Sequence, residues 1–584
     1  KGAADFFVAG RALPFWAIGM SVVVSDIGAT DFIATAGAGY TYGVSAANFD
    51  WIGSMPALAF AAFLFVPYYW RAGVFTIPEF LGRRYNAAVQ LIHGGIWGVF
   101  LVIMLAVMLW LTAVMIETIL GWDVYFSIWL IVILTGIYTF SGGLSAVVMT
   151  DAVQMIVMFI GGGALLALSL YAVGGFGELR DNTLEREPIL MVNFSVDLGD
   201  DPDAESEGRP SSDETLSILE GLLGSADIGY TGITTAGTTA PDQVAYAVAL
   251  DAPPESTTEE LVVYRDLLRS EVELEELDNV ATVELRDFRR FFTLLLPHDT
   301  HTPYPWTGVV FGLGIVMATA YMAGNQAVVQ RSLGARSEWD AKGGMLFAGF
   351  LKVFIPLLVI VPGLAAVQLV PPLANGDAAV PTMMRELLPP GLRGLMFAGL
   401  FAALMSSVDS SLNSATTIWT TDIIGRIRQL LTGERLSTRA SLYIGRTLTV
   451  VFIVFAGFMA PIFRDESTMY DFIQTALSMF QGPVLAVLLL GILWKRATQW
   501  GGLAGLVLGV CVSTILNYTE GVFPSDNPFL FVAWWSFIFS LIVTVVVSLL
   551  TPPEPEEKIR GLIFGQVMQD GKLQRVLQDR VNGS

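Results

Sequence analysis

Apolar segments long enough to cross a lipid bilayer constrain the fold of this chain more than any other feature. A membrane-spanning helix needs about 20 mostly apolar residues to cross about 30 Å of hydrocarbon, where its backbone must satisfy its own hydrogen bonds. Hydrophobic residues make up 54% of the 584 residues and charged residues 15%, so the chain is more apolar than ordinary soluble domains. We therefore predict an all-α polytopic membrane protein with about twelve spans. They cover residues 14–44, 47–70, 87–120, 124–140, 145–174, 306–330, 342–370, 392–425, 441–462, 468–494, 498–517 and 528–551.

Charges between the spans predict which loops face the cytoplasm. Arginine and lysine gather in alternate loops, and the positive-inside rule places such loops in the cytoplasm. The other loops are mostly acidic and include a long insert, residues 176–304, which we expect outside the cell. The start of the sequence and its tail then both lie inside, and the protein is expected in the plasma membrane. The basic residues used are Arg71, Arg83, Arg84, Arg331, Arg336, Lys342, Arg426, Arg428, Arg435, Arg439, Lys495 and Arg496.

The insert shows strand-like alternation in four stretches and helical spacing in two. Their order is βαββαβ, which indicates a small ferredoxin-like α/β domain. Disorder is the alternative for residues 199–212, which are rich in Asp, Glu, Ser, Gly and Pro. The sequence points to no partner for this domain. In chain order the stretches are Ile189–Asp197, Asp213–Leu223, Asp227–Thr234, Val244–Asp251, Thr258–Leu274 and Val280–Asp287.

The net charge of −21 is concentrated in the insert, and the sequence pI is about 4.5. An acidic outer surface predicts a high-salt habitat and hence a halophilic prokaryote, while a solvated loop without adaptation is the alternative. The negative charge also disfavours nucleic-acid binding. The single cysteine, Cys511, rules out an intrachain disulfide and a cysteine metal cluster.

The first apolar segment is interrupted by Val24–Asp31, which contains a glycine and two aspartates. Ionisable groups and broken helices survive in a membrane only where protein or a water-filled cavity surrounds them, so this break predicts a solute or ion site. No phosphate-binding lysine motif and no catalytic cluster is present, which favours a transporter over an enzyme. His298 and His301 are interpreted as solvated loop residues, because two histidines without further ligands are a weak metal signal.

Short motifs are spread over nearly the whole chain, except the insert and the tail. They are Phe6–Arg11, Thr76–Phe80, Gly142–Val148 with Thr150-Asp151, Asn325-Gln326 with Gln330-Arg331, Phe347–Lys352 through Pro362-Gly363, Ala403–Ser407 with Asn413–Ala415, and Gly491–Arg496. These motifs resemble the sodium/solute symporter family (SSS), and within it the sodium/glucose (galactose) cotransporters. The resemblance implies a LeuT-like core of two inverted five-helix repeats, preceded in the family by one more helix that this sequence does not include. It also implies sodium-coupled symport of a small polar solute, a sugar or polyol, by alternating access.

The repeats set the expected domain boundaries. Residues 1–175 hold spans 1–5 and residues 305–495 hold spans 6–10, with the insert at 176–304 between them. Residues 496–551 form two accessory spans, and residues 552–584 form a cytoplasmic tail. The tail is too short for an output domain, which argues against the remaining alternative, a transporter-like membrane protein that senses a solute.

The resemblance also implies a sodium site at the broken first span. Sodium is a hard cation that needs several oxygen ligands, which an unwound helix and nearby hydroxyls can supply. The alternative is that small residues here only allow helices to pack closely. The implied ligands are the carbonyls of Val24, Ile27 and Ala403 and the hydroxyls of Ser406 and Ser407.

A second cation position is expected around Asp151, Asp409 and Ser410. Family members with a second sodium site use an aspartate at the Asp151 position, but here Asp409 replaces a family hydroxyl. Two buried carboxylates cannot both stay ionised without a cation. A second sodium ion, a shared proton and a structural ion pair with an arginine not yet located remain open, so the chain is expected to bind one sodium ion or two.

The resemblance places the solute between the repeats. The expected groups would suit the hydroxyls of a polyol, although positions Met104 and Ala318 lack amides that the sugar transporters carry. The alternatives are an amino acid or another charged or amino-bearing solute, with Lys352 only neutralising an aspartate and Tyr321 acting as packing or as a gate. The candidate substrate-binding residues are Asp26, Asp31, Asp50, Trp51, Tyr321, Lys352 and Gln474.

Overall fold

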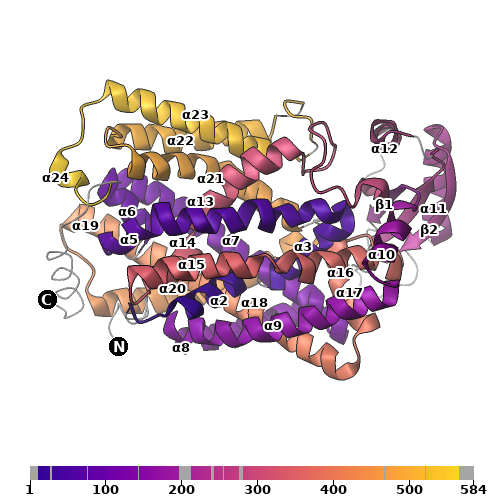
Figure 1. Cartoon of the computed structure of the whole chain (residues 1–584), viewed down its shortest axis with the longest axis horizontal. Coiled ribbons are helices and arrows are strands. Elements are labelled where there is room, and N and C mark those ends of the chain that lie inside the picture. Colours follow the sequence, from indigo (N-terminus) through magenta and orange to yellow (C-terminus); the bar gives the residue numbers. More distant parts are fainter. Residues whose placement is uncertain are drawn as a thin grey trace.

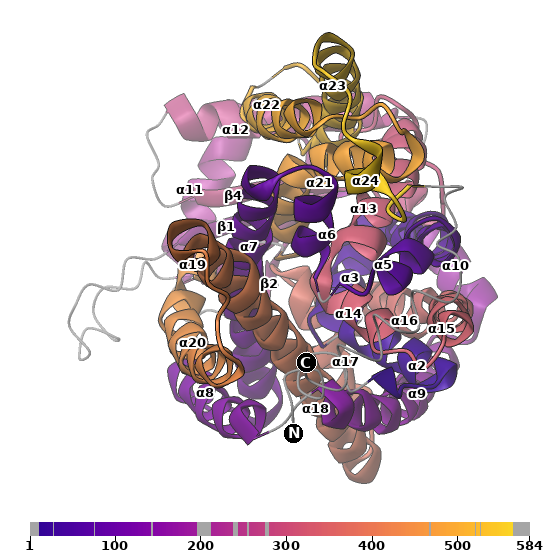
Figure 2. The ribbon, with the colours of Figure 1, turned by 90° about the vertical axis from the view of Figure 1, so that its left-hand side faces the viewer.

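Long helices that run side by side form the body of the molecule, with a small α/β unit at one end (Figure 1). Viewed along the bundle, α22 and α23 lie at its edge (Figure 2). The computed structural model describes residues 11–26, 29–74, 76–141, 144–195, 212–237, 243–253, 256–274, 280–465, 469–519, 521–525 and 527–563.

Each expected span coincides with one helix or one interrupted helix, so the helical membrane fold is confirmed. Among the described residues, nine helices are long and apolar enough to cross a membrane, and a bent pair makes a tenth. Two shorter apolar helices, Phe15–Asp26 and Val124–Ile137, account for the other two spans. The bundle contains α2 (Phe15–Asp26), α3 (Ala29–Tyr42), α4 (Met55–Phe60), α5 (Val66–Ala72), α6 (Ile77–Arg84), α7 (Ala87–Leu120), α8 (Val124–Ser141), α9 (Leu144–Val173), α13 (Ala318–Gly324), α14 (Gln326–Leu333), α15 (Glu338–Lys352), α16 (Ile355–Leu369), α17 (Ala379–Leu387), α18 (Pro390–Thr417), α19 (Gly425–Thr432), α20 (Thr438–Met459), α21 (Met469–Leu493), α22 (Gln499–Asn517) and α23 (Phe529–Leu550), and α24 (Glu556–Ile559) follows it.

In the described part of the chain the sixth span is interrupted, since the helices on either side of Asn325 are bent by 54°. The first span consists of α2 and α3, and Ile27 and Gly28 between them lie outside the described residues. Asn325 has extended backbone (φ −76°, ψ 120°), and its side chain caps α14 by accepting a hydrogen bond from the Ala327 N–H at 2.9 Å. Broken helices at membrane depth require surrounding protein or a cavity, so the break at Asn325 marks a candidate functional region.

Glycines let helices of the two repeats approach closely. A Cβ built on Gly363 of α16 would lie 2.3 Å from the carbonyl oxygen of Ala36 in α3. A Cβ on Gly19 of α2 would lie 2.9 Å from the carbonyl oxygen of Gly344 in α15. Small residues at helix crossings are a common means of close packing in membranes, and here they hold the interrupted first span against the seventh.

Gly363→Ala is expected to lower the melting midpoint of the purified protein in detergent. The new methyl group would collide with the Ala36 carbonyl, and overpacking of this kind costs about 1–3 kcal/mol. Gly163→Ala is the matched control, because no atom lies within 4 Å of a Cβ built there, and its midpoint should match the parent. Equal midpoints for the two variants would contradict the close approach of α3 and α16.

The insert contains a four-stranded sheet covered on one face by two helices, which confirms a small α/β unit. The strands pair antiparallel in the order β2-β3-β1-β4. Leu190, Val192 and Val248 on one sheet face pack with Leu219 and Leu268 of the helices to form a separate apolar core. After α10 (Phe176–Leu184), the elements are β1 (Ile189–Ser195), α11 (Ser212–Ser225), β2 (Tyr230–Ala236), β3 (Gln243–Leu250), α12 (Thr258–Leu274) and β4 (Val280–Arg286).

The insert is docked on the hairpin between α16 and α17. Gly237 exchanges backbone hydrogen bonds with this hairpin, donating to the Pro372 carbonyl at 2.7 Å and accepting from the Ala374 N–H at 2.9 Å. Arg286 donates to the Leu373 carbonyl at 3.1 Å, and its guanidinium lies 5.0 Å from the ring centroid of Tyr40 in α3. The α/β unit is therefore fixed to the ends of two bundle helices.

Asp377 is a buried carboxylate in the same hairpin. Its Oδ2 accepts a hydrogen bond from the Met469 N–H at 3.4 Å, at the start of α21. Gly37 of α3 lies so close that a Cβ there would be 2.6 Å from Asp377 Oδ1. Burial raises the pKa of Asp377 to about 7, because the ionised form loses hydration.

The raised pKa of Asp377 predicts that folding weakens as pH rises through about 7. The folded pKa lies above the unfolded value of 3.8, so the folded state binds the proton more tightly and gains stability as pH falls towards the unfolded value. Asp377→Asn is expected to flatten this dependence and to raise the melting midpoint at alkaline pH, with the exposed Asp299→Asn as control. An unchanged pH profile in Asp377→Asn would contradict the prediction.

Candidate functional site

A central cavity lies among helices from both repeats. Its empty volume is about 870 Å³, including space open to solvent. Two of its walls come from π-helical turns, Phe49–Ser54 and Gly308–Met317, a distortion that is frequent at functional sites. The lining residues are Ser25, Asp26, Thr35, Phe49, Asp50, Ser54, Phe100, Met104, Met108, Leu313, Met317, Ala318, Tyr321, Met322, Lys352, Ile355, Val359, Ile473, Gln474, Leu477 and Gln481.

Lys352, at the end of α15, joins two carboxylates of the cavity wall. Its Nζ donates to Asp50 Oδ1 at 2.9 Å and to Ser54 Oγ at 3.1 Å, and it forms an ion pair with Asp26 of α2. All three charged side chains are buried, with Lys352 only 3% exposed. These contacts tie the interrupted first span, the second span and the seventh span together at the cavity.

Five of the seven expected substrate residues line this cavity: Asp26, Asp50, Tyr321, Lys352 and Gln474. The Trp51 side chain is not among the lining groups. Its indole N–H donates to the Val353 carbonyl at 3.1 Å, which fastens the second span to the residue after α15. The side chain of Asp31 lies outside the part of the chain that the structure describes.

The cavity has an apolar side. Met104 and Ala318, at the two positions where the sugar transporters carry amides, both line it. Tyr321 packs against Trp97, with ring centroids 6.3 Å apart, and Trp97 packs edge-on against Phe480 at 5.1 Å. This aromatic cluster positions the Tyr321 ring at the cavity wall.

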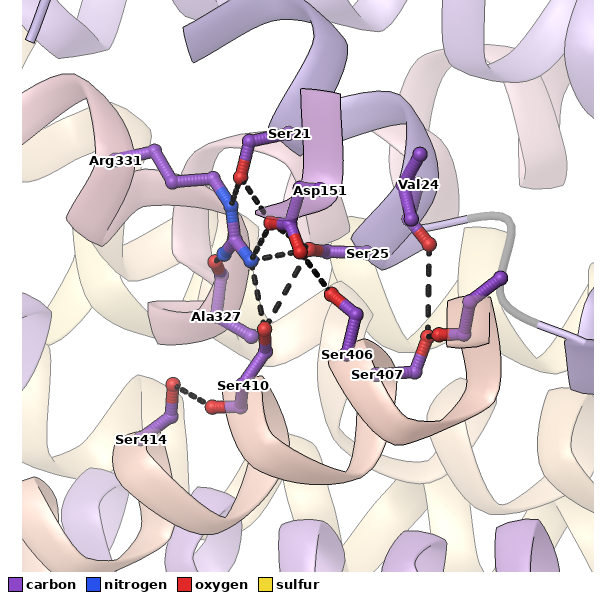
Figure 3. Close-up of polar contacts among 11 residues, drawn as sticks. Ser21, Val24, Ser25, Asp151, Ala327, Arg331, Ser406, Ser407, Ser410 and Ser414 are labelled. Carbon is purple, nitrogen blue, oxygen red and sulfur yellow. Dashed lines mark hydrogen bonds and ion pairs between the residues drawn. The ribbon is translucent and has the colours of Figure 1, made fainter. Parts of the chain in front are cut away.

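Three of the expected sodium ligands meet beside the broken first span. Ser407 Oγ donates to the Ala403 carbonyl at 3.1 Å and lies 3.5 Å from the Val24 carbonyl oxygen (Figure 3). Two carbonyls and a hydroxyl on facing helices suit a hard cation. Ser406 points elsewhere, because its hydroxyl donates to Asp151 Oδ1. Ile27 lies outside the described residues.

The expected second cation position contains a guanidinium. Arg331 of α14 pairs with Asp151 of α9 at 3.4 Å, and both side chains are fully buried (Figure 3). Arg331 also donates to Ser410 Oγ at 2.7 Å and to Ser21 Oγ at 2.6 Å. Asp409 is buried as well, and its charge acts on the same guanidinium. The arginine that the sequence left unlocated is therefore Arg331.

Two arginines interpreted as cytoplasmic loop charges are buried instead. Arg331 lies in α14, the second half of the interrupted sixth span. Arg84 donates to the carbonyls of Gly491, Trp494 and Ala497 at 2.7, 3.1 and 3.0 Å, across the end of α21. The sequence signal that could have indicated a buried Arg331 is its position at the end of an apolar span, where charged residues are usually paired with an opposite charge.

The interrupted helices, the polar cavity between the repeats and the oxygens gathered beside it define a membrane transporter of the inverted-repeat class. Residues 6–219 and 272–509 match the Sodium:solute symporter family. The chain belongs to this family.

Known proteins similar to this chain include two cotransporters. Sodium/glucose cotransporter 1 of Oryctolagus cuniculus is 28% identical over 606 residues, covering 98% of this chain and 78% of that protein. The Homo sapiens sodium/myo-inositol cotransporter is 29% identical over 601 residues, covering 96% and 71%. A solved structure of a Na⁺-coupled sialic acid symporter, in a substrate-bound outward-open state, has a TM-score of 0.66 at 20% identity and covers 95% of this chain and 93% of that one. The similarity to this structure shows that the two proteins share a fold.

Family membership establishes the coarse function. The chain is a multi-pass membrane protein that couples transport of a small solute to sodium, and it is a transporter rather than an enzyme. Sodium and a small solute are its partners.

Proposed function

We propose that this protein imports a sugar or polyol together with sodium by alternating access. The observation that carries the proposal is the convergence of Asp26, Asp50, Tyr321, Lys352 and Gln474 from five separate helical segments on one cavity. Carboxylates and amides bind the hydroxyls of a polyol, and an aromatic ring suits a sugar face. The cavity combines apolar and aromatic side chains with a few polar groups, as small-molecule sites usually do. The glucose and myo-inositol cotransporters among its relatives support the same solute class.

We propose one sodium ion for each solute. The oxygens of Val24, Ala403 and Ser407 suit one hard cation, with the Ile27 carbonyl and the Ser406 hydroxyl as further candidates. At the second position, around Asp151, Asp409 and Ser410, Arg331 supplies a cation from the protein. One entering charge contributes about 2.3 kcal/mol per 100 mV of membrane potential, which is enough to drive a neutral solute uphill.

Sodium binding is proposed to favour the outward-open state, because its proposed ligands come from two separate helices. Val24 belongs to the interrupted first span, whereas Ala403 and Ser407 belong to α18. A ligand shifts a conformational equilibrium only through its different affinity for the two states. Sodium would therefore bind more tightly to the state in which α2 and α18 lie closer together.

The insert is proposed to face the outside of a plasma membrane and the acidic charge to reflect a saline habitat. The arginines and lysines of the alternate loops support this orientation. The side of the insert can be read from its cleavage by externally added protease in intact cells.

Uptake into proteoliposomes tests the function. Labelled sugars, polyols, amino acids and carboxylates are offered with and without an inward sodium gradient. Accumulation of a sugar or polyol that requires the gradient is expected, with a Hill coefficient for sodium of about 1. Accumulation of another solute class would contradict the proposal of a sugar or polyol. A Hill coefficient near 2 would contradict the proposal of one sodium ion for each solute.

Ser407→Ala is expected to raise the sodium concentration for half-maximal uptake by about tenfold, because one cation ligand is lost. Ser169→Ala is the matched control. Ser169 in α9 is also buried, and its hydroxyl likewise donates to the carbonyl four residues earlier, Leu165, at 2.7 Å. Sodium dependence unchanged in Ser407→Ala would remove this hydroxyl from the sodium site.

A further inference from the structure

Counted as formal charges, the described side chains that line the cavity sum to minus one. Among the charged side chains that line it in the described part of the chain, Asp26 and Asp50 stand against Lys352 alone. An ammonium group has three N–H donors, and those of Lys352 have Asp26, Asp50 and Ser54 as partners. Lys352 therefore has no further donor with which to bind an acidic solute.

The charge of the sodium ion compensates a different cluster of charged side chains, outside the solute cavity. Beside the sodium oxygens, one guanidinium, Arg331, faces two buried carboxylates, Asp151 and Asp409. Ser406 joins this cluster to the sodium site, because it donates to Asp151 and precedes Ser407. A sodium ion at the oxygens of Val24, Ala403 and Ser407 balances the excess negative charge of the neighbouring cluster. The excess in the solute cavity is then left for the solute to balance.

The rest of the cavity wall fits a cation that also carries hydroxyls. The aromatic residues Phe49, Phe100 and Tyr321 line it, and aromatic rings attract cations. Thr35 and Gln474 offer neutral hydrogen-bond partners for hydroxyls. Burying an uncompensated charge is costly, whereas an opposite charge within reach of the same carboxylates offsets that cost.

Building on the proposed transport of a sugar or polyol, we propose that the solute carries one protonated amine, as an amino sugar or amino polyol does. Its ammonium group lies against the carboxylates of Asp26 and Asp50, and its hydroxyls face the neutral side chains of the wall. The same charge distribution excludes sugar acids.

Matched solutes test this inference in proteoliposomes with a fixed sodium gradient and membrane potential. Glucose and glucosamine, galactose and galactosamine, and inositol and an amino-inositol are compared as neutral and cationic pairs at mildly acidic pH, where the amines are protonated. N-acetylglucosamine controls for size at C2, and glucuronate supplies the negative charge. Within the transported pair, the amine is expected to be preferred about tenfold or more in uptake at low concentration, and glucuronate is expected to be excluded.

Asp26→Asn is expected to remove the preference for the amine over the neutral solute, because Lys352 and Asp50 then form a pair without net charge. Asp50→Asn is an independent second variant in case Asp26→Asn fails to fold. Asp422→Asn is the control. Asp422 is a buried acid outside the cavity, which accepts hydrogen bonds from Thr76 at 3.0 Å and Gln90 at 2.7 Å. Its removal is expected to leave the amine preference unchanged.

Equal uptake of amine and neutral solutes by the parent protein would overturn the inference while leaving sodium-coupled sugar transport in place. A preference for the amine that survives both Asp26→Asn and Asp50→Asn would also overturn it. Failure of every sugar and polyol to accumulate with sodium would instead contradict the proposed function, and the inference with it.

Discussion

Lys352→Met is expected to abolish sodium-driven uptake and to lower the melting midpoint more than any other single change at the cavity. The substitution leaves Asp26 and Asp50 buried together without the cation that joins them. Removing one partner of a buried ion pair costs about 3–5 kcal/mol. Uptake in proteoliposomes and thermal unfolding in detergent measure the two effects on the same preparation.

Lys342→Met is the matched control on the same helix. Lys342 pairs with Glu338 at 2.6 Å, but both side chains are partly exposed, and such surface pairs contribute about 0–1 kcal/mol. Its uptake and midpoint should stay near those of the parent. Adding Asp50→Asn to Lys352→Met should recover part of the midpoint but not the uptake. Normal uptake by Lys352→Met would show that Lys352 serves packing alone.

Arg331→Met is expected to produce the second large loss, in both stability and transport. The guanidinium joins α14 to Ser21 of α2, Asp151 of α9 and Ser410 of α18. Its removal leaves Asp151 without its buried cation, which again costs about 3–5 kcal/mol. Arg428→Met is the control, since Arg428 pairs with Glu434 at 3.1 Å in an exposed position.

A double substitution separates the ion pair from other roles of Arg331. Arg331→Met with Asp151→Asn removes both charges of the pair and should recover much of the midpoint lost in the single variant. The double variant Arg331→Met with Asp409→Asn tests whether removing the second carboxylate also recovers the melting midpoint. If neither double variant recovers stability, the arginine acts through its hydroxyl and carbonyl contacts and not through charge. A sodium Hill coefficient that rises in Arg331→Met would indicate that sodium replaces the guanidinium.

The spans were predictable because hydropathy is a local property. Segments such as 87–120 and 528–551 coincide closely with α7 and α23, since each must match the thickness of the bilayer on its own. A break at Val24–Asp31 was also predicted, because aspartates and glycine within an apolar run are costly unless protein or a cavity surrounds them. The structure has helix up to Asp26 and again from Ala29, and the two residues between them lie outside its described part. The strand and helix alternation of the insert reflects local periods of 2 and 3.6 residues.

The site was only partly predictable. The resemblance to sodium/solute symporters indicated Asp26, Asp50, Tyr321, Lys352 and Gln474, which line one cavity. Trp51 was assigned to the solute because it follows Asp50, but its indole bonds to Val353. Arg331 was counted as a loop charge, because its position in the chain carries no sign of the distant Asp151 that it pairs with.

The sequence by itself determined that this is a membrane-embedded helical protein with a small α/β insert and the motifs of a sodium/solute symporter. Those properties depend on composition and on periodicity within single segments. Only the tertiary structure decided which charges neutralise one another: Lys352 with Asp26 and Asp50, and Arg331 with Asp151. The reason is that an ion pair depends on the distance between atoms from separate helices, and that distance follows from how the helices pack and not from their spacing along the chain.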